Sequence, residues 1–116
     1  MTRNSALFIK DIIENMDNAE SFAVNLTYKQ LTDDRKTAYA VVRCLEIIGE
    51  ASKNVPQGIR LKYPEIPWKK MAGMRDKIIH FYFGVKFKTV WYTVKKDIPK
   101  LKPLLQKVLA DLEAKK

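Results

Sequence analysis

The chain has 116 residues, a length that suits one domain built around a single core. Hydrophobic residues make up 47% of it, with only four glycines and five prolines, which argues against a disordered chain and against a turn-rich all-β fold. The 22 basic and 13 acidic residues give a net charge of +9, which favours an anionic partner such as nucleic acid, or an acidic protein, over a neutral metabolite. We therefore expect one domain, spanning residues 1–116.

Amphipathic helical patterns fill the first half of the chain. Apolar side chains recur every three to four residues from Ser5 to about Phe22. A looser segment, Val24 to Leu31, leads to a second helix, for which Asp33 or Asp34 is the expected N-cap. The cleanest apolar stripe of the chain lies on this second helix and consists of Ala38, Val41, Val42, Leu45, Ile48 and Ala51.

Prolines and glycines divide the second half. They leave room for a short helix around Ile59 to Lys62, followed by a helix from Pro67 to about Phe83 that stops at Gly84 in a left-handed cap. A last helical stretch covers roughly Phe87 to Ala114 and should be bent or restarted at Pro99, since proline removes a backbone hydrogen bond. No strand alternation stands out. The predicted fold is all-α, an antiparallel up-and-down bundle of four to five helices.

Composition also limits the chemistry. One cysteine and one histidine exclude a zinc site of the usual multi-ligand kind within one chain, and no metal or cofactor is expected. Cys44 sits in a helical pattern and is predicted to be a buried, inert thiol. No signal-peptide stretch is evident, and no apolar run approaches the ~20 residues that span a bilayer. We expect a cytoplasmic protein without a membrane partner.

The most informative segment is Arg75–Tyr82, which contains the only histidine, His80. Histidine takes and gives protons near neutral pH, and arginine is a permanent planar cation suited to phosphate oxygens. A proton shuttle beside a phosphate-binding cation is what metal-independent RNA cleavage requires. On a straight helix, however, His80 lies about 140° around the axis from Arg75, whereas Tyr82 shares the arginine's face.

That separation would keep Arg75 and His80 of one chain from reaching one phosphate. Either the helix unwinds near Gly84 and swings the histidine round, or a second copy of the chain brings its own pair in a symmetric dimer. We favour the dimer. Structural roles compete with the catalytic interpretation: the histidine suits a helix C-terminus, the arginine suits a facing carboxylate on another helix, and Tyr82 suits the edge of a core.

Further segments carry a family resemblance that covers nearly the whole chain in register. They are Leu45-Glu46-Ile47-Ile48-Gly49-Glu50-Ala51, Tyr63-Pro64-Glu65-Ile66-Pro67-Trp68, Met71-Ala72-Gly73-Met74-Arg75, His80-Phe81-Tyr82-Phe83-Gly84-Val85, Val90-Trp91 and Asp97-Ile98-Pro99. In this combination the chain resembles the HepT-like family of HEPN-domain proteins, the toxin halves of type VII HepT–MntA toxin–antitoxin pairs.

The resemblance implies a HEPN-like helical bundle that dimerises and forms a composite ribonuclease site between protomers. Arg75 and His80 match the family's catalytic arginine and histidine, and Asp76 occupies the polar supporting position after the arginine. Tyr82 matches the tyrosine that receives AMP from the MntA nucleotidyltransferase, a modification that silences the toxin. The implied activity is metal-independent endoribonuclease cleavage that leaves a 2′,3′-cyclic phosphate.

The implied partners are an RNA substrate, a second copy of the chain and a cognate MntA-type nucleotidyltransferase antitoxin, with a larger hetero-oligomer left open. An alternative from another functional class also remains open. In it the bundle is a non-catalytic helical subunit that binds the nucleotidyltransferase, and the motif holds a nucleotide or phosphate without cutting it.

Overall fold

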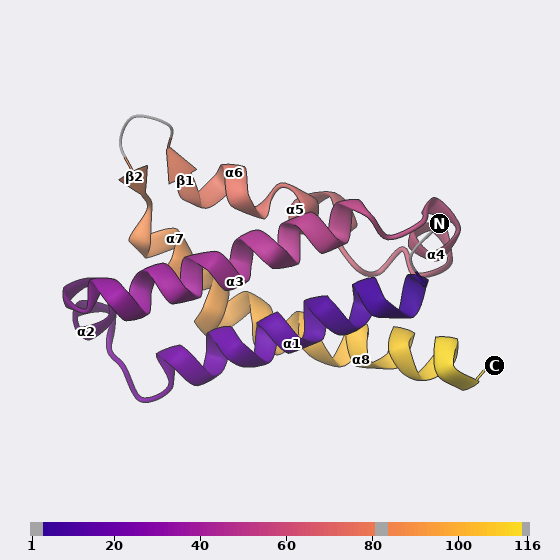
Figure 1. Ribbon diagram of the computed structural model, residues 1–116, viewed down its shortest axis with the longest axis horizontal. Coiled ribbons are helices and arrows are strands. Elements are labelled where there is room, and N and C mark those ends of the chain that lie inside the picture. Colours follow the sequence, from indigo (N-terminus) through magenta and orange to yellow (C-terminus); the bar gives the residue numbers. More distant parts are fainter. Residues whose placement is uncertain (1–3, 81–83, 115–116) are drawn as a thin grey trace.

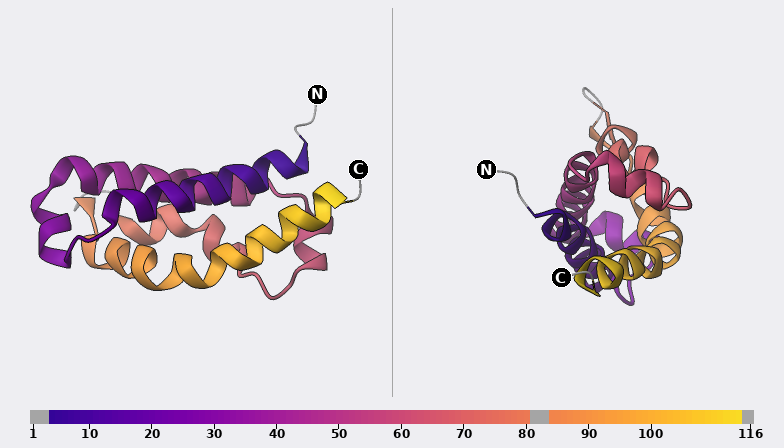
Figure 2. Two further views of the ribbon diagram at one scale, coloured as in Figure 1. Left: turned by 90° about the horizontal axis from the view of Figure 1, so that it is seen from below. Right: turned by 90° about the vertical axis from the view of Figure 1, so that its right-hand side faces the viewer.

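A computed structural model describes residues 4–80 and 84–114, with the backbone alone for residues 79–80 and 84–85. Its elements in chain order are α1 (Ser5–Ala23), α2 (Tyr28–Asp33), α3 (Arg35–Lys53), α4 (Gln57–Lys62), α5 (Trp68–Ala72), α6 (Met74–Ile78), β1 (Ile79–His80), β2 (Gly84–Val85), α7 (Phe87–Tyr92), the π-helix η1 (Thr93–Asp97) and α8 (Ile98–Ala114). The chain reverses direction from α1 to α3, again to α5–α6, and again to α7–α8 (Figures 1 and 2). The predicted all-α antiparallel bundle is confirmed.

Side-chain caps set the first helix boundaries. Asn4 accepts a hydrogen bond from the Ala6 amide (2.8 Å) and starts α1 at the predicted residue. Of the two candidate caps before α3, Asp34 is the one used, and it accepts from the Thr37 amide (3.1 Å). The looser segment before it holds the short helix α2, which a capping box at Thr27 begins.

The core forms where α1 packs on α3 and α8 (Figure 2). The apolar stripes predicted for the first two helices face inward, so most of their side chains have no exposed surface. Removing such a side chain from water stabilises the fold by about 1.5–3 kcal/mol. The fully buried residues that the three helices contribute include Ile9, Ile12, Met16, Leu45, Ile48, Ile98 and Leu105.

Polar contacts also fasten α8 to its neighbours. The Lys102 ammonium donates to Asp17 (2.9 Å) and to Glu20, both on α1. The Tyr63 hydroxyl, at the end of α4, donates to the Asp111 carboxylate (2.7 Å). These contacts lie at separate points along α8 and fix its position along the bundle.

The final helical stretch changes its winding before Pro99. After α7 the backbone forms the π-helix η1, and α8 begins at Ile98, one residue before the proline. A π-helix accommodates one more residue than an α-helical turn, and it often occurs where the α-helical ladder is interrupted. The restart predicted at Pro99 is therefore confirmed. Pro103 lies within α8 without ending it.

The helix predicted from Pro67 to about Phe83 is wrong in its second half. It divides into α5 and α6, and α6 ends at Ile78. Residues 78–83 are β-branched, aromatic or histidine, side chains that lose rotamer freedom in a helix and favour strands. The predicted left-handed cap at Gly84 is also wrong, because this residue lies in β2 and pairs with His80 in an antiparallel register.

Candidate active site

The arginine of the motif lies on α6, which packs closely on α3 because of a glycine. A Cβ atom on Gly49 would stand 3.2 Å from the Met71 carbonyl oxygen and 3.4 Å from that of Ala72. A larger residue in the middle of α3 would therefore push the end of α5 away. Since α6 follows directly, Gly49 sets the distance of Arg75 from α3.

Arg75 reaches a carboxylate on the neighbouring helix. Its Nε donates a hydrogen bond to Glu46 Oε2 (3.3 Å), and its Nη1 lies 3.7 Å from Asp76 Oδ1. The arginine side chain is 57% exposed and that of Glu46 is 26% exposed. The alternative of a facing carboxylate is thus confirmed as a contact. It leaves the two terminal amino groups of the guanidinium without a hydrogen bond to a described residue, so the cation is held in place and still open to an anion.

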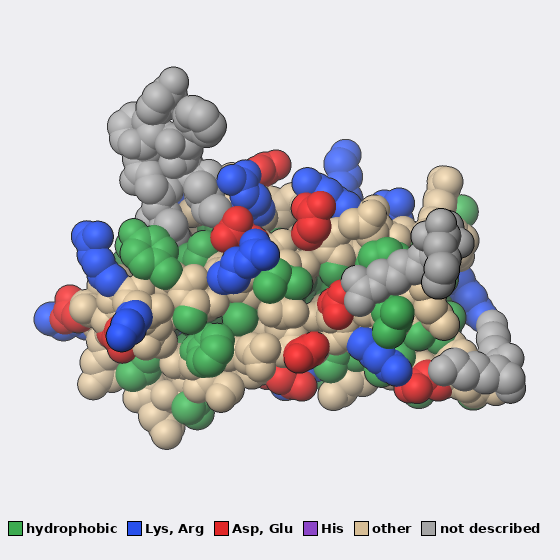
Figure 3. Space-filling model, in the orientation of Figure 1, with side chains coloured by type: hydrophobic (Ala, Val, Ile, Leu, Met, Phe, Trp, Pro, Cys, Tyr) green, Lys and Arg blue, Asp and Glu red, His purple; other side chains and the backbone are tan. Residues whose placement is uncertain are grey.

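A hollow of about 370 Å³ opens beside the arginine, between α1, α3 and α6. Acidic and basic side chains are interspersed on this face of the molecule (Figure 3). The charged residues that line the hollow are Asp11, Arg43, Glu46, Glu50 and Arg75. Three carboxylates and two guanidinium groups give it no positive excess, so the hollow orients Arg75 and does not itself attract RNA.

His80 lies in a strand and not on the helix that carries the arginine. The backbone of β1 continues directly from α6, His80 pairs with Gly84, and the amide of Lys86 donates to the Ile78 carbonyl (2.7 Å). The helical separation of about 140° therefore does not apply, and the argument for a dimer that rested on it is wrong. Of the two arrangements considered, the structure has the unwound backbone, and the unwinding begins before His80.

The other two predicted residues differ in how far the structure places them. Asp76 is 79% exposed, beside the Arg75 guanidinium, which fits a supporting role. Tyr82 lies outside the described residues. The expectation that Tyr82 shares a helix face with Arg75 lies outside the described residues with it.

Sequence reasoning missed Glu46 and the role of Gly49. Both belong to the apolar helix 35–53, where a central glycine lowers helix stability by about 1 kcal/mol relative to alanine. A glycine at such a position is a signal for a close backbone approach, and a carboxylate one turn before it points to the same neighbour.

Cys44, in contrast, is buried as predicted, and burial raises the pKa of its thiol, which keeps the thiol protonated at neutral pH.

None of the helices in the described part of the chain is long and apolar enough to cross a membrane. No solved structure gives a significant match to the chain. Among curated relatives, "Putative RNase MJ1216" of Methanocaldococcus jannaschii is 50% identical over 113 residues, which cover 97% of this chain and 93% of the relative. "Probable ribonuclease HepT" of Thermococcus cleftensis is 47% identical over 108 residues, covering 93% of this chain and 98% of that protein.

A family model covers most of the chain as well. The model described as "Ribonuclease HepT-like" matches residues 12–108, a range that runs from α1 to α8 and includes Glu46, Gly49 and the whole Arg75–Tyr82 motif. The chain belongs to the ribonuclease HepT-like family.

Proposed function

We propose that this protein is a metal-independent endoribonuclease, the toxin of a type VII HepT–MntA toxin–antitoxin pair. The observation that carries the proposal is the open guanidinium of Arg75, which Glu46 holds at the rim of a hollow. Arg75 lies on α6, and this helix leads directly into the strand that holds His80. Family membership and the ribonuclease names of two relatives support the same activity.

The proposed chemistry uses these two side chains in different roles. His80 takes the proton of a ribose 2′-hydroxyl, and the oxygen attacks the adjacent phosphorus. The bond from phosphorus to the 5′-oxygen breaks, so the products are a 2′,3′-cyclic phosphate and a 5′-hydroxyl. Arg75 stabilises the negative charge that builds on the phosphate oxygens, a contribution worth about 100- to 1,000-fold in rate.

A second copy of the chain completes the proposed site. The histidine of one chain takes the proton of the 2′-hydroxyl, and the partner subunit's histidine gives a proton to the leaving 5′-oxygen, as the family resemblance implies. Arg75 and the β1–β2 hairpin lie at one edge of the bundle, where the hairpin stands away from α1 and α8 (Figure 1). Two such edges can meet about a two-fold axis, which would bring both pairs into one cleft.

Regulation is proposed to act on the same edge. Tyr82 follows His80 by two residues, so an AMP group transferred to it by an MntA-type nucleotidyltransferase adds bulk and negative charge beside the catalytic pair. The modified tyrosine would compete with the RNA phosphate for Arg75. Co-incubation with the cognate nucleotidyltransferase, ATP and Mg²⁺ should add AMP mass to the wild-type chain but not to Tyr82→Phe. Labelling of the variant would place the modification elsewhere.

The decisive experiment measures RNA cleavage in EDTA by purified protein whose intact mass shows no AMP. Wild-type protein and an Arg35→Ala control, an exposed arginine at the start of α3, should cleave. Arg75→Ala and His80→Ala should not, while their helical circular dichroism stays unchanged. An unmodified, folded dimer that binds the nucleotidyltransferase but never cleaves RNA would favour the non-catalytic alternative and overturn this proposal.

A further inference from the structure

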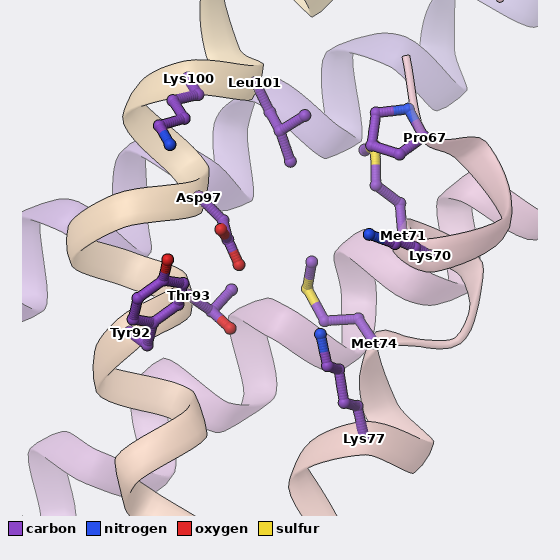
Figure 4. A pocket seen from close by; sticks show the side chains of 10 residues that line it. All are labelled: Pro67, Lys70, Met71, Met74, Lys77, Tyr92, Thr93, Asp97, Lys100 and Leu101. Carbon is purple, nitrogen blue, oxygen red and sulfur yellow. The ribbon is translucent and has the colours of Figure 1, made fainter. Parts of the chain in front are cut away.

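A second hollow lies on the opposite side of α6 from Arg75. It has a volume of about 350 Å³ and separates α5–α6 from the wall formed by Tyr92, η1 and the start of α8 (Figure 4). Its floor is apolar and includes Met71, Met74 and Leu101. We call it the lysine groove, because Lys70 and Lys77 stand on one wall and Lys100 stands on the other.

The charged groups that line the lysine groove are mostly positive. None of the three ammonium groups forms an ion pair with a residue in the described part of the chain, although Asp97 lines the same hollow. The four charged groups of the groove therefore sum to +2. Lys70 lies on α5 and Lys77 lies on α6, so their charges are spread along one wall of the groove (Figure 4).

We propose that the lysine groove binds single-stranded RNA. A positive groove that follows the backbone, combined with an aromatic side chain for a base to stack on, is the usual design of single-strand binding sites. Here Lys70, Lys77 and Lys100 contact successive phosphates, and the exposed ring of Tyr92 at the groove's edge stacks on a base.

The aromatic ring and the apolar floor favour RNA over an acidic protein as the ligand. Asp97 repels phosphates and peptide carboxylates alike, but it accepts hydrogen bonds from ribose hydroxyls or from the amino groups of bases. An apolar floor with one exposed aromatic ring suits a flat base as well. The lysines, the carboxylate, the aromatic ring and the apolar floor therefore all fit a nucleotide strand.

The groove also points toward the catalytic motif. Lys77 lies three residues before His80, and α6 leads directly into β1. RNA held along α6 would thus lead to the strand that holds His80, along the side of α6 that faces away from Arg75. The inference deepens the proposed ribonuclease function, since it rests on RNA being the substrate, and it assigns the residues that hold the strand outside the catalytic pair.

The test measures binding without cleavage, by fluorescence anisotropy of a labelled single-stranded 2′-O-methyl oligonucleotide that lacks the attacking hydroxyl. The groove variant is Lys70→Gln, Lys77→Gln and Lys100→Gln together. Its matched control removes three exposed lysines elsewhere, as Lys36→Gln, Lys53→Gln and Lys107→Gln, so both proteins carry the same net charge.

We expect the groove variant to bind about 100-fold more weakly at 0.1 M salt and its log affinity against log salt to lose about 2 units of slope, about 0.7 for each phosphate contact. The control should change affinity less than about 3-fold, and Tyr92→Leu should weaken binding about 10-fold. Equal losses in the two lysine variants, or an unchanged groove variant, would overturn the groove. Groove-dependent binding by a protein that never cleaves RNA would instead overturn the proposed ribonuclease and leave the groove standing.

Discussion

The long helices and the motif-bearing segment of this protein are built in opposite ways. The helices α1, α3 and α8 have 19, 19 and 17 residues and continuous apolar stripes that bury each other. The segment from α5 to β2 is divided into elements of five, five, two and two residues. Short elements have little stability of their own, so the position of the motif depends on the long helices beneath it.

The difference teaches that the scaffold and the chemistry respond to different changes. Stability resides in side chains that the long helices bury, whereas the position of Arg75 depends on two residues of α3, Gly49 and Glu46. Variants chosen from each region should therefore separate activity from stability. The following experiments test that separation, from the largest expected effect to the smallest.

The first experiment removes the catalytic cation. Arg75→Ala should lower the rate of RNA cleavage by about 100- to 1,000-fold, equivalent to about 3–4 kcal/mol of transition-state stabilisation. Arg75→Lys should recover little of it, since an ammonium lacks the planar fork that contacts two phosphate oxygens. The free energy of unfolding from thermal melting should change by less than about 1 kcal/mol, because the guanidinium of the pair with Glu46 is more than half exposed. Full activity in Arg75→Ala would remove this residue from the mechanism.

The second experiment makes a cavity in the scaffold. Ile48 on α3 has no exposed surface, so Ile48→Ala should lower the free energy of unfolding by about 2–5 kcal/mol in urea denaturation. At a temperature where the variant remains folded, its cleavage rate should stay within a few-fold of wild type. A large loss of activity in the folded variant would show that the core and the site are not separable.

The third experiment tests the contact between the two regions. Glu46→Ala should lower cleavage about 10-fold while leaving melting nearly unchanged, because the guanidinium loses its positioning partner. Glu46→Gln retains an oxygen acceptor and should keep most of the activity. The exposed Glu50 lines the same hollow, and Glu50→Ala is the matched control, expected to change the rate less than about 2-fold. An equal loss in both alanine variants would argue for an effect of charge alone.

The fourth experiment adds a single methyl group. In Gly49→Ala the gain in helix propensity, about 1 kcal/mol, opposes a clash with two backbone carbonyls that costs about 1–3 kcal/mol. We expect a net loss of about 1 kcal/mol in stability together with slower cleavage. Gly58 on α4 has nothing within 4 Å of such a methyl group, so Gly58→Ala should stabilise the protein. Stabilisation by both changes would mean that Gly49 does not set the approach of α5.

The smallest effect concerns alkaline pH. Hydrogen bonds from Lys102 to Glu20 and Asp17 raise the pKa of its ammonium above the ordinary 10.5. The folded state therefore binds this proton more tightly than the unfolded state, and the resulting stability is present below pH 10.5 and lost as the pH rises through the folded pKa. Melting curves should show that Lys102→Met loses less stability between neutral and strongly alkaline pH than Lys107→Met, a control on the same helix. Identical pH profiles would contradict this assignment.

Sequence patterns predicted the long helices well. Periodic apolar residues located α1 and α3 to within a residue or two, and Pro99 located the restart of α8. Such patterns succeed there because burial of one continuous face dominates the energetics. The patterns do not reveal which partner each face meets, so the contact of Glu46 with Arg75 required the structure.

The motif itself was the least predictable part of the fold. Residues from Met74 onward fit a helical period until Ile78, but the β-branched and aromatic run that follows favours a strand. The identity of Arg75, His80 and Asp76 as candidates came from residue chemistry and family resemblance. Their relative geometry did not follow from either, because one change from helix to strand altered every angle derived from a straight helix.

The π-helix before α8 contains one residue more than an α-helix needs for the same turn. Deleting one residue from Thr93–Asp97 would therefore allow an ordinary α-helix to form with every later side chain still on its present face. Leu105 and Val108 would stay in the core, and Lys102 would still face α1. A deletion within α8 has no extra residue to absorb it and would rotate every later side chain by about 100° about the helix axis. The same change in chain length is thus a matter of local packing at the π-helix, whereas within α8 it would reassign the inner and outer faces of the helix that follows.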